Sequence, residues 1–223
     1  MPKIVFWDFD GTLVHPNERF VDHLFYSLRA FQKEGSREDV RIALQSAYPW
    51  LRYETSYAGT TAKWWNTFFA RLSPFYKRCA IDEAESKQIN ELFKERMITQ
   101  HDYALYEDAK SVLQACINRG YQNCLLSNNY PELDVAIKAL SLDGYFSDCF
   151  ISGKIGYEKP RRELFEYAKE KTGCRSGVMV GDNPIADVLG AKNAGLSAVL
   201  VHRTCPSEAD ATCATLTELL EIL

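Results

Sequence analysis

Short apolar runs alternate with helix-like segments along most of this chain, and this alternation limits the fold more than any other feature. The first run is Lys3-Ile4-Val5-Phe6-Trp7, and further runs lie at 123–126, 149–151, 178–180 and 198–201. Segments with helical spacing lie at 108–118, 131–140, 161–171, 184–194 and 217–222. Strands that alternate with helices form a parallel sheet with helices on both faces. The sequence therefore predicts an α/β, Rossmann-like core of three layers.

The pattern changes between about residues 15 and 100, where no strand is needed. Four segments with helical spacing lie there, at 20–32, 36–46, 60–72 and 82–97. In the first of them apolar residues recur every three or four positions, which places them on one helix face. We therefore predict a core formed by residues 1–14 and 101–223, with an all-helical insertion at 15–100.

Polar residues directly follow three of the predicted strands. Asp8 and Asp10 follow the first strand, Ser127 the second and Asp182 the fourth. Because ligands of open parallel sheets bind at the carboxyl ends of the strands, we expect these side chains to converge in space. Carboxylates on alternate residues of an extended backbone point to the same side and repel each other, and a metal ion is the usual remedy. The pair therefore indicates chemistry rather than architecture.

Four motifs stand in a fixed order along the chain. They are Asp8-Phe9-Asp10-Gly11-Thr12, Leu125-Leu126-Ser127-Asn128, Lys159-Pro160, and Gly181-Asp182-Asn183-Pro184-Ile185-Ala186-Asp187. In kind and order they resemble the motifs of the haloacid dehalogenase-like (HAD) hydrolase superfamily, and the resemblance extends from Ile4 to about Val201. In that superfamily a helical insertion after the first strand is the C1 cap, which closes over the active site. The chain departs from the pattern at Arg161-Arg162, where relatives often have Asp-Pro.

The resemblance implies roles for the residues of the first three motifs. Asp8 would be the nucleophile that forms an aspartyl-phosphate, and Asp10 would act first as general acid and then as general base. Ser127 through its hydroxyl, Asn128 through its amide and Lys159 through its charge would bind the phosphate oxygens.

The resemblance also implies a metal site built from oxygen atoms. Asp8, the carbonyl oxygen of Asp10, and Asp182 would be ligands, and Asp187 would support the site from behind. A hard, all-oxygen site of this kind suits Mg²⁺.

The implied activity is Mg²⁺-dependent hydrolysis of a small soluble phosphate ester, and alternatives remain open. A phosphomutase would use the same intermediate but return the phosphoryl group to a bound sugar. A non-catalytic binding or regulatory relative would have lost a motif carboxylate or the lysine, and none is lost here. The dehalogenases of the superfamily lack the residue equivalent to Asp10, so its presence favours phosphate chemistry. A two-component receiver domain would be much shorter and would lack Asp10-Gly11-Thr12.

The insertion is expected to select the substrate. An aromatic, glycine-containing stretch at 50–65 lies between two predicted helices, and such residues suit small-ligand pockets. Within it we predict that Arg52, Tyr53 and Thr60 contact the leaving group.

Composition narrows the classes of protein that the chain can represent. A net charge of -4 and the lack of a Lys/Arg block argue against a nucleic-acid partner. Seven scattered cysteines without a CxxC pair predict reduced thiols in a cytoplasmic protein. The chain enters a strand at once, which leaves no room for a signal peptide, and no apolar run is long enough to predict a membrane partner. The oligomeric state is left undecided.

Overall fold

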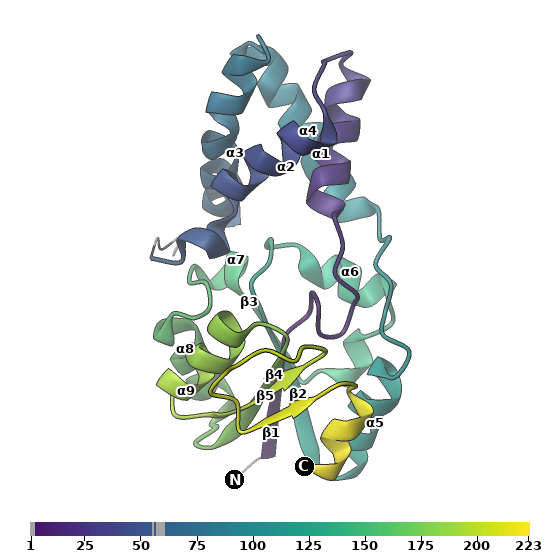
Figure 1. Cartoon of the computed structure of the whole chain (residues 1–223), viewed down its shortest axis with the longest axis vertical. Helices are drawn as coiled ribbons and strands as arrows, with labels where there is room; N and C mark the ends of the chain where they lie inside the picture. Colours follow the sequence, from purple (N-terminus) through teal and green to yellow (C-terminus); the bar gives the residue numbers. More distant parts are fainter. Residues whose placement is uncertain (1–2, 55, 57–60) are drawn as a thin grey trace.

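The computed structural model describes residues 3–54, 56 and 61–223, and a six-stranded parallel sheet lies in the lower half of the molecule as Figure 1 draws it. The strands are β1 (Lys3–Trp7), β2 (Tyr121–Ser127), β3 (Asp148–Ile151), β4 (Gly177–Gly181), β5 (Ser197–Val201) and β6 (Ala211–Cys213). The predicted α/β class is confirmed. The sequence did not predict β6, because an edge strand of three residues with a central threonine offers no apolar run.

The order of the strands is β3-β2-β1-β4-β5-β6, so the chain winds to one side of β1 and then to the other. Trp7 at the end of β1 pairs with Leu125 of β2 and with Val180 of β4. The carboxyl ends of these three central strands therefore lie at one edge. An edge where the winding direction reverses is the usual ligand site of such sheets.

Each face of the sheet is covered by helices. Val5 and Trp7 belong to one buried cluster and Ile4 and Phe6 to another, as expected for alternate residues of a strand buried on both faces. Buried residues of α5 (Ala109–Asn118) and α6 (Leu133–Ala139) join the first cluster. Those of α8 (Arg162–Thr172) and α9 (Gly190–Asn193) join the second. These helices and the sheet form the three layers.

Short helical segments complete the core. They are α7 (Ser152–Ile155), the turns Asp143–Tyr145 and Thr217–Glu221, and a π-helical segment at Pro184–Leu189. The predicted helix at 184–194 is thus divided into the π-helical segment and α9. Asn183 caps the first part, because its side-chain oxygen accepts hydrogen bonds from the N–H groups of Ile185 and Ala186.

The described helices between Arg19 and Thr99 form a lobe beyond the carboxyl edge of the sheet (Figure 1). Its helices are α1 (Arg19–Ala30), α2 (Arg37–Ala47), α3 (Thr61–Arg78) and α4 (Glu83–Thr99), with a 3₁₀ turn at Pro49–Arg52. Ser36 and Asp82 form capping boxes that begin α2 and α4. The helix α3 continues past its predicted end and through Pro74, because Phe75 and Tyr76 beyond it are buried.

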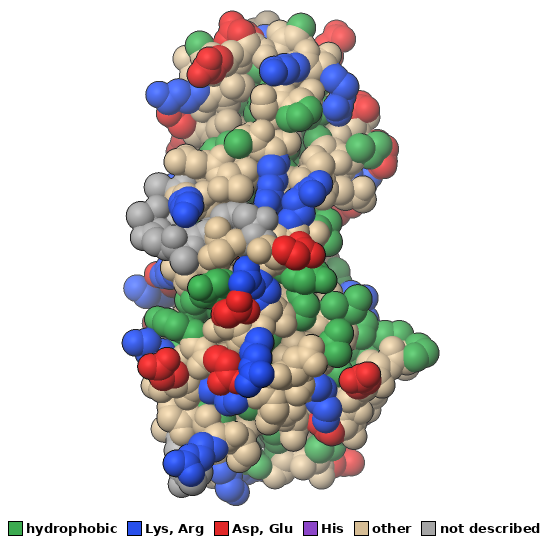
Figure 2. Space-filling model, turned by 90° about the vertical axis from the view of Figure 1, so that its left-hand side faces the viewer, with side chains coloured by type: hydrophobic (Ala, Val, Ile, Leu, Met, Phe, Trp, Pro, Cys, Tyr) green, Lys and Arg blue, Asp and Glu red, His purple; other side chains and the backbone are tan. Residues whose placement is uncertain are grey.

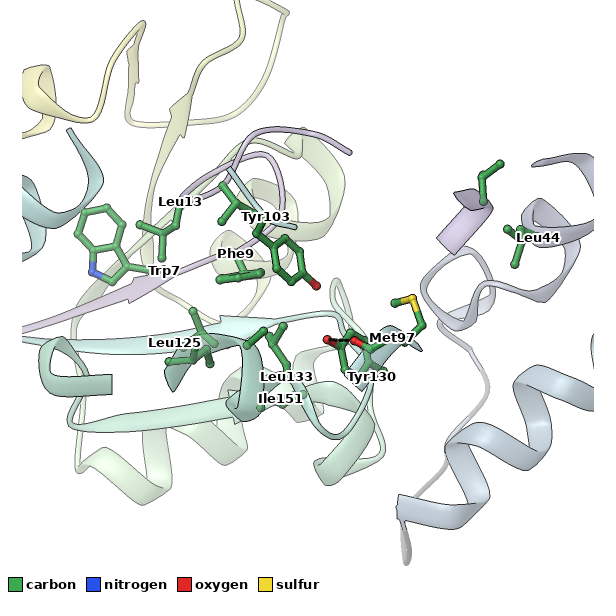
Figure 3. Packing of buried hydrophobic residues seen from close by; sticks show 14 of the residues in the cluster. Trp7, Phe9, Leu13, Leu44, Met97, Tyr103, Leu125, Tyr130, Leu133 and Ile151 are labelled. Atoms are coloured by element: carbon green, nitrogen blue, oxygen red, sulfur yellow. Dashed lines mark hydrogen bonds between the residues drawn. The ribbon is translucent and has the colours of Figure 1, made fainter. Parts of the chain in front are cut away.

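Apolar packing is continuous from the sheet into the lobe. Figure 3 shows Trp7 and Leu125 of the strands at one end of the cluster and Leu44 of α2 at the other. Tyr130 and Met97 meet between them, and the Tyr130 hydroxyl donates a hydrogen bond to the Met97 carbonyl oxygen at 3.1 Å. This contact fixes the end of α4 against the segment that follows β2.

The two segments that connect the lobe to the core run side by side. The N–H of His15 donates to the carbonyl oxygen of Ala104 at 2.8 Å, and the N–H of Tyr106 donates to that of Leu13 at 3.0 Å. The lobe is therefore attached through one paired connection, next to the Asp8–Thr12 motif.

Side chains of both charges lie on the surface of the protein. On the face drawn in Figure 2, Lys and Arg side chains are interspersed with Asp and Glu side chains. Within the described part of the chain, no helix has both the length and the apolar composition needed to cross a bilayer.

Candidate functional site at the carboxyl edge of the sheet

The predicted motif residues meet at the carboxyl edge of the sheet. Asp8 follows β1, Ser127 ends β2 and Asp182 follows β4, while Lys159 arrives from the loop before α8. All four are buried. A cavity of about 590 Å³ lies between this edge and the lobe, and its core-side lining includes Asp8, Asp10, Asn128, Lys159 and Asp182. Convergence of the motifs, which the sequence pattern predicts, is present in the structure.

Lys159 is held by three acceptors. Its Nζ donates to Oδ1 of Asp8 at 2.8 Å, to Oδ1 of Asp187 at 2.6 Å and to the carbonyl oxygen of Leu126 at 2.8 Å. Burial by itself lowers the pKa of Lys159, but Asp187 and Asp8 outweigh it, so the pKa lies above its ordinary value. The ammonium group therefore stays charged and separates two carboxylates.

The side chain of Asn128 fixes the backbone that carries this lysine. Its Oδ1 accepts from the N–H of Lys159 at 2.6 Å, and its Nδ2 donates to the carbonyl oxygen of Lys159 at 2.9 Å. This two-sided contact joins the ends of β2 and of the loop before α8. The resemblance assigned only the main-chain amide of Asn128, so the contact is an addition to the predicted site.

Asp10 accepts two amide hydrogen bonds that the sequence did not predict. Asn129 Nδ2 donates to its Oδ2 at 2.7 Å, and Asn17 Nδ2 donates to its Oδ1 at 3.1 Å. Burial, and after it the charge of Asp8, raise the pKa of Asp10 to about 6, although both amides oppose the shift. A carboxyl group with such a pKa can both donate and accept a proton near neutral pH. Asn129 directly follows the second motif, which was a usable signal, whereas Asn17 carried none.

A cluster of carboxylates fits a small divalent cation. Oxygen atoms of Asp8, Asp182 and Asp187 lie within 4.8 Å of one another. Burial raises the pKa of Asp182 and of Asp187 above the ordinary value, and the charge of Asp8 adds to both shifts, although the charge of Lys159 opposes them. Charged carboxylates in a buried position repel each other, and a cation would relieve this cost. The donors are all hard oxygens, which suits Mg²⁺.

Asp187 already uses both of its oxygens. Oδ1 accepts from Lys159, and Oδ2 accepts from the N–H of Asn183 at 2.9 Å. A Cβ on Gly181 would lie 2.2 Å from the Asp187 carboxyl carbon, so this position has no room for a side chain. The geometry therefore favours Asp187 as the residue that orients Lys159, and its place behind a metal stays a prediction.

Ser127 has a hydroxyl without a partner. Its Oγ is buried, and no hydrogen bond to it occurs within the part of the chain that the structure describes. Buried hydroxyl groups in native proteins are normally paired. Ser127 does not itself line the cavity but precedes Asn128, which does, and its unpaired hydroxyl is consistent with the predicted contact to a phosphate oxygen.

The lobe supplies the opposite wall of the cavity. Arg41, Gln45, Tyr48, Trp50 and Tyr53 are among its lining residues. Tyr53 thus lines the cavity, and its contact with a leaving group stays a prediction. The sequence did not predict Arg41, because its spacing on α2 is that of an ordinary solvated residue.

The other two residues predicted to contact the leaving group are Arg52 and Thr60, and neither is seen to line this cavity. Arg52 lines a separate hollow with Glu54 and Arg71, and its Nε donates to the carbonyl oxygen of Ser46 at 3.3 Å. Arg52 does not line the cavity that contains Asp8. Neighbouring residues of a tight helical turn point in different directions, so Tyr53 can face the cavity while Arg52 does not. Thr60 lies outside the described residues.

Glu158 is a buried carboxyl group at the contact between lobe and core. Trp64 of α3 donates its indole N–H to Glu158 Oε1 at 3.3 Å, and no hydrogen bond among the described residues reaches Oε2. Burial raises the pKa of Glu158 from 4.5 to about 7, against smaller opposing effects of Ser152, Trp64 and Lys159. The tryptophan therefore packs in the lobe and also binds the core.

We expect Glu158→Gln to remove one pH-dependent contribution to stability. Because the folded-state pKa of about 7 lies above the ordinary 4.5, the contribution is complete below pH 4.5 and is lost as pH rises through 7. The shift corresponds to about 3 kcal/mol. As pH rises from 4.5 to 8.5, the free energy of unfolding of Glu158→Gln, measured by urea denaturation, should therefore increase relative to that of wild type by about this amount.

Exposed Glu170 provides the matched control. Glu170→Gln should show the pH profile of the wild type. A Glu158→Gln profile parallel to that of wild type would show that Glu158 keeps an ordinary pKa.

Comparison with known proteins agrees with the geometry of the site. The family model for haloacid dehalogenase-like hydrolases matches residues 2–195. A phosphoserine phosphatase from Thermus thermophilus is 35% identical over 159 residues, which are 69% of this chain and 62% of that protein. The matched part of this chain thus spans less than two thirds of that relative.

Solved structures match the whole fold. The magnesium-bound HAD hydrolase YfnB from Bacillus subtilis has a TM-score of 0.78 at 18% identity, covering 100% of this chain and 98% of that chain. A 2-haloacid dehalogenase from Pseudomonas syringae has a TM-score of 0.73 at 20% identity, covering 100% and 98%. At these identities the likeness concerns the fold alone, and the side chains of the site must distinguish the chemistry.

Proposed function

Because the chain belongs to the haloacid dehalogenase-like hydrolase family, we propose that it is a Mg²⁺-dependent phosphomonoesterase acting on a small phosphate ester. One observation carries the choice of phosphate over carbon–halide chemistry. The carboxyl group of Asp10 lines the same cavity as Asp8, is oriented by two amides and has a pKa of about 6. A leaving alkoxide needs such a proton donor.

The proposed reaction has two halves. An oxygen of Asp8 attacks phosphorus while Asp10 gives its proton to the leaving oxygen, so the ester bond breaks and a neutral alcohol departs. Asp10 then accepts a proton from water, the water oxygen attacks phosphorus, and the bond to Asp8 breaks to release inorganic phosphate. Mg²⁺, when held by Asp8, the Asp10 carbonyl oxygen and Asp182, would supply positive charge at the phosphate.

Groups around the reacting atoms hold the phosphate oxygens in this scheme. The unpaired Ser127 hydroxyl and the main-chain amide of Asn128 would donate to them. Lys159, fixed between Asp8 and Asp187, keeps a positive charge beside the nucleophile at every stage. This preorganised charge is the main source of transition-state stabilisation that we propose.

The helical lobe, in this proposal, is a cap that contacts the leaving group. It forms one wall of the cavity and is attached through the paired connection near His15 and Ala104. Core residues would bind the phosphoryl group, which all substrates share, and lobe residues would bind the part that differs. The division predicts that substitutions in the lobe change preference more than chemistry.

The test is turnover of an aryl phosphate by the purified protein. We expect hydrolysis with Mg²⁺, loss of turnover in excess chelator, and recovery when Mg²⁺ is returned. Full activity in chelator would remove the metal from the mechanism. A panel of sugar, nucleotide and organic-acid phosphates would then identify the substrate class. Transfer of the phosphoryl group to a sugar hydroxyl instead of water would indicate a phosphomutase, and no turnover of any ester would favour a non-catalytic role.

We expect Tyr53→Ala to change the order of substrates in this panel. Tyr53 lines the cavity on the lobe side, so its loss should lower kcat/KM by about 10-fold for large leaving groups, from the area it would bury. The small aryl phosphate should keep its rate within about 2-fold. Arg52→Ala is the matched control, because Arg52 lines the separate hollow, and it should leave the order unchanged. A uniform loss across the panel for Tyr53→Ala would make Tyr53 structural.

A further inference from the structure

Arg203 is a charged residue of the site that no motif contains. It lies two residues beyond the end of β5, and it lines the cavity. Gly181 of β4 pairs with Leu200 of β5, so Asp182 and the residues after β5 leave the sheet at the same edge. This register brings the Arg203 side chain to Asp182.

The backbone before Arg203 is held firmly. His202 adopts a φ of 60°, and its N–H donates to the carbonyl oxygen of Cys213 at 3.0 Å. Its ring stacks on Tyr106 with 3.8 Å between centroids and an interplanar angle of 8°, and its Nε2 lies 3.1 Å from the carbonyl oxygen of Thr12. A left-handed residue other than glycine persists only where its surroundings determine it. The base from which Arg203 extends is therefore fixed.

The guanidinium group of Arg203 binds one oxygen of Asp182 through two nitrogens. Nε donates to Oδ2 at 2.9 Å and Nη2 donates to the same atom at 2.6 Å. The carboxylate also lies against Gly11, where a Cβ would be 2.6 Å from the same Oδ2. Among the described residues no hydrogen bond reaches Oδ1 of Asp182. The arrangement occupies one oxygen and leaves the second for a cation.

We propose that Arg203 is a positioning residue that orients Asp182 for Mg²⁺ binding. The proposal rests on the metal site of the proposed function. Asp182 has only 10% of its side chain exposed, so without Arg203 its Oδ2 would lose both donors in a place that water reaches poorly. Residues that hold a metal ligand in this way typically contribute 10- to 100-fold to metal affinity.

The positive charge of Arg203 by itself weakens Mg²⁺ binding, because two cations repel. Arg203 is 51% exposed, which screens its charge. The aspartates of the cavity, among them Asp8, Asp10 and Asp187, place several negative charges near the cation. We therefore expect the loss of orientation to outweigh the relief of repulsion when Arg203 is replaced.

The experiment is calorimetric titration of the metal-free protein with Mg²⁺. Arg203→Met should raise the Kd for Mg²⁺ 10- to 100-fold, and Arg203→Lys, which keeps the charge but lacks the fork, should raise it by a smaller factor. Arg162→Met is the matched control, since Arg162 is 69% exposed and pairs only with Glu166 among the described residues. If Arg203→Met does not fold, judged by circular dichroism, the lysine variant carries the test.

The Mg²⁺ titrations distinguish a failure of this proposal from a failure of the proposed function. Unchanged or tighter Mg²⁺ binding in Arg203→Met, or wild-type affinity in Arg203→Lys, would overturn the proposal. A wild-type protein that binds no Mg²⁺ would instead overturn the metal requirement of the proposed function. Inhibition by inorganic phosphate at saturating Mg²⁺ should be the same in wild type and Arg203→Met. Weaker inhibition in the variant would assign Arg203 to the phosphate and contradict a positioning role.

Discussion

Asp8→Asn is expected to lower kcat for the aryl phosphate by on the order of 10⁴-fold or more, because removal of an enzymic nucleophile has effects of this size. The protein should still fold, since Lys159 keeps Asp187 and the Leu126 carbonyl oxygen as acceptors. Acid quenching during turnover should trap a phosphoryl group on the wild-type protein and none on Asp8→Asn.

Asp10→Asn separates the nucleophile from the proton donor. This variant should lose about 10²- to 10⁴-fold in kcat, the usual contribution of general acid–base catalysis, and should still carry a trapped phosphoryl group on Asp8. Exposed Asp143→Asn is the control and should match wild type. A phosphoryl group found on any residue other than Asp8 would overturn the assignment.

Lys159→Met is expected to affect both stability and turnover. Lys159 and Asp187 each have 1% of their side chains exposed, and Asp8 has 11%. Loss of the lysine leaves these carboxylates close together without a cation, which costs about 3–5 kcal/mol of unfolding free energy at neutral pH. Turnover at saturating Mg²⁺ should fall by about 10²- to 10³-fold, because a preorganised charge is lost. Urea denaturation and initial rates measure the two effects.

Two further variants show whether this cost is electrostatic. Lys159→Met/Asp187→Asn should recover part of the lost stability, because one buried charge is removed, but not the lost turnover. Lys154→Met removes a surface ion pair with Asp134, in which both side chains are 44% exposed, and should cost at most about 1 kcal/mol. Equal losses for Lys154→Met and Lys159→Met would show that the buried ion pairs contribute no more than a surface pair.

The sequence by itself determined the class of fold and the principal residues at the carboxyl edge of the sheet. Apolar runs predict strands, and the residue directly after a strand must lie at the sheet edge whatever the rest of the chain does. Asp8, Ser127 and Asp182 were predictable for this reason. Lys159 follows no strand, and only its place in the order of motifs identified it.

The tertiary structure alone decided which partners these residues have. Asn17, Asn129 and Arg203 reach the site from connecting segments outside the helices and strands, where a change of one backbone angle redirects a side chain. The strand register and the stacking of His202 on Tyr106 place Arg203, and a hydrogen bond from the Asn129 N–H to Ser152 Oγ holds the backbone of Asn129. Asn17 and Arg203 carried no local sequence signal, because their contacts depend on how separate segments pack together, whereas Asn129 lies next to a recognised motif.

In the lobe, too, the sequence determined the helices and the tertiary structure decided which side chains line the cavity. Helical periodicity predicted its helices, because a buried face repeats every three to four residues. It did not predict that Tyr53 would line the cavity and Arg52 a separate hollow, or that Arg41 of α2 would line the cavity. Local periodicity determines which face of a helix is buried, whereas the residues that face a cavity depend on how helices and connecting turns are placed against the core.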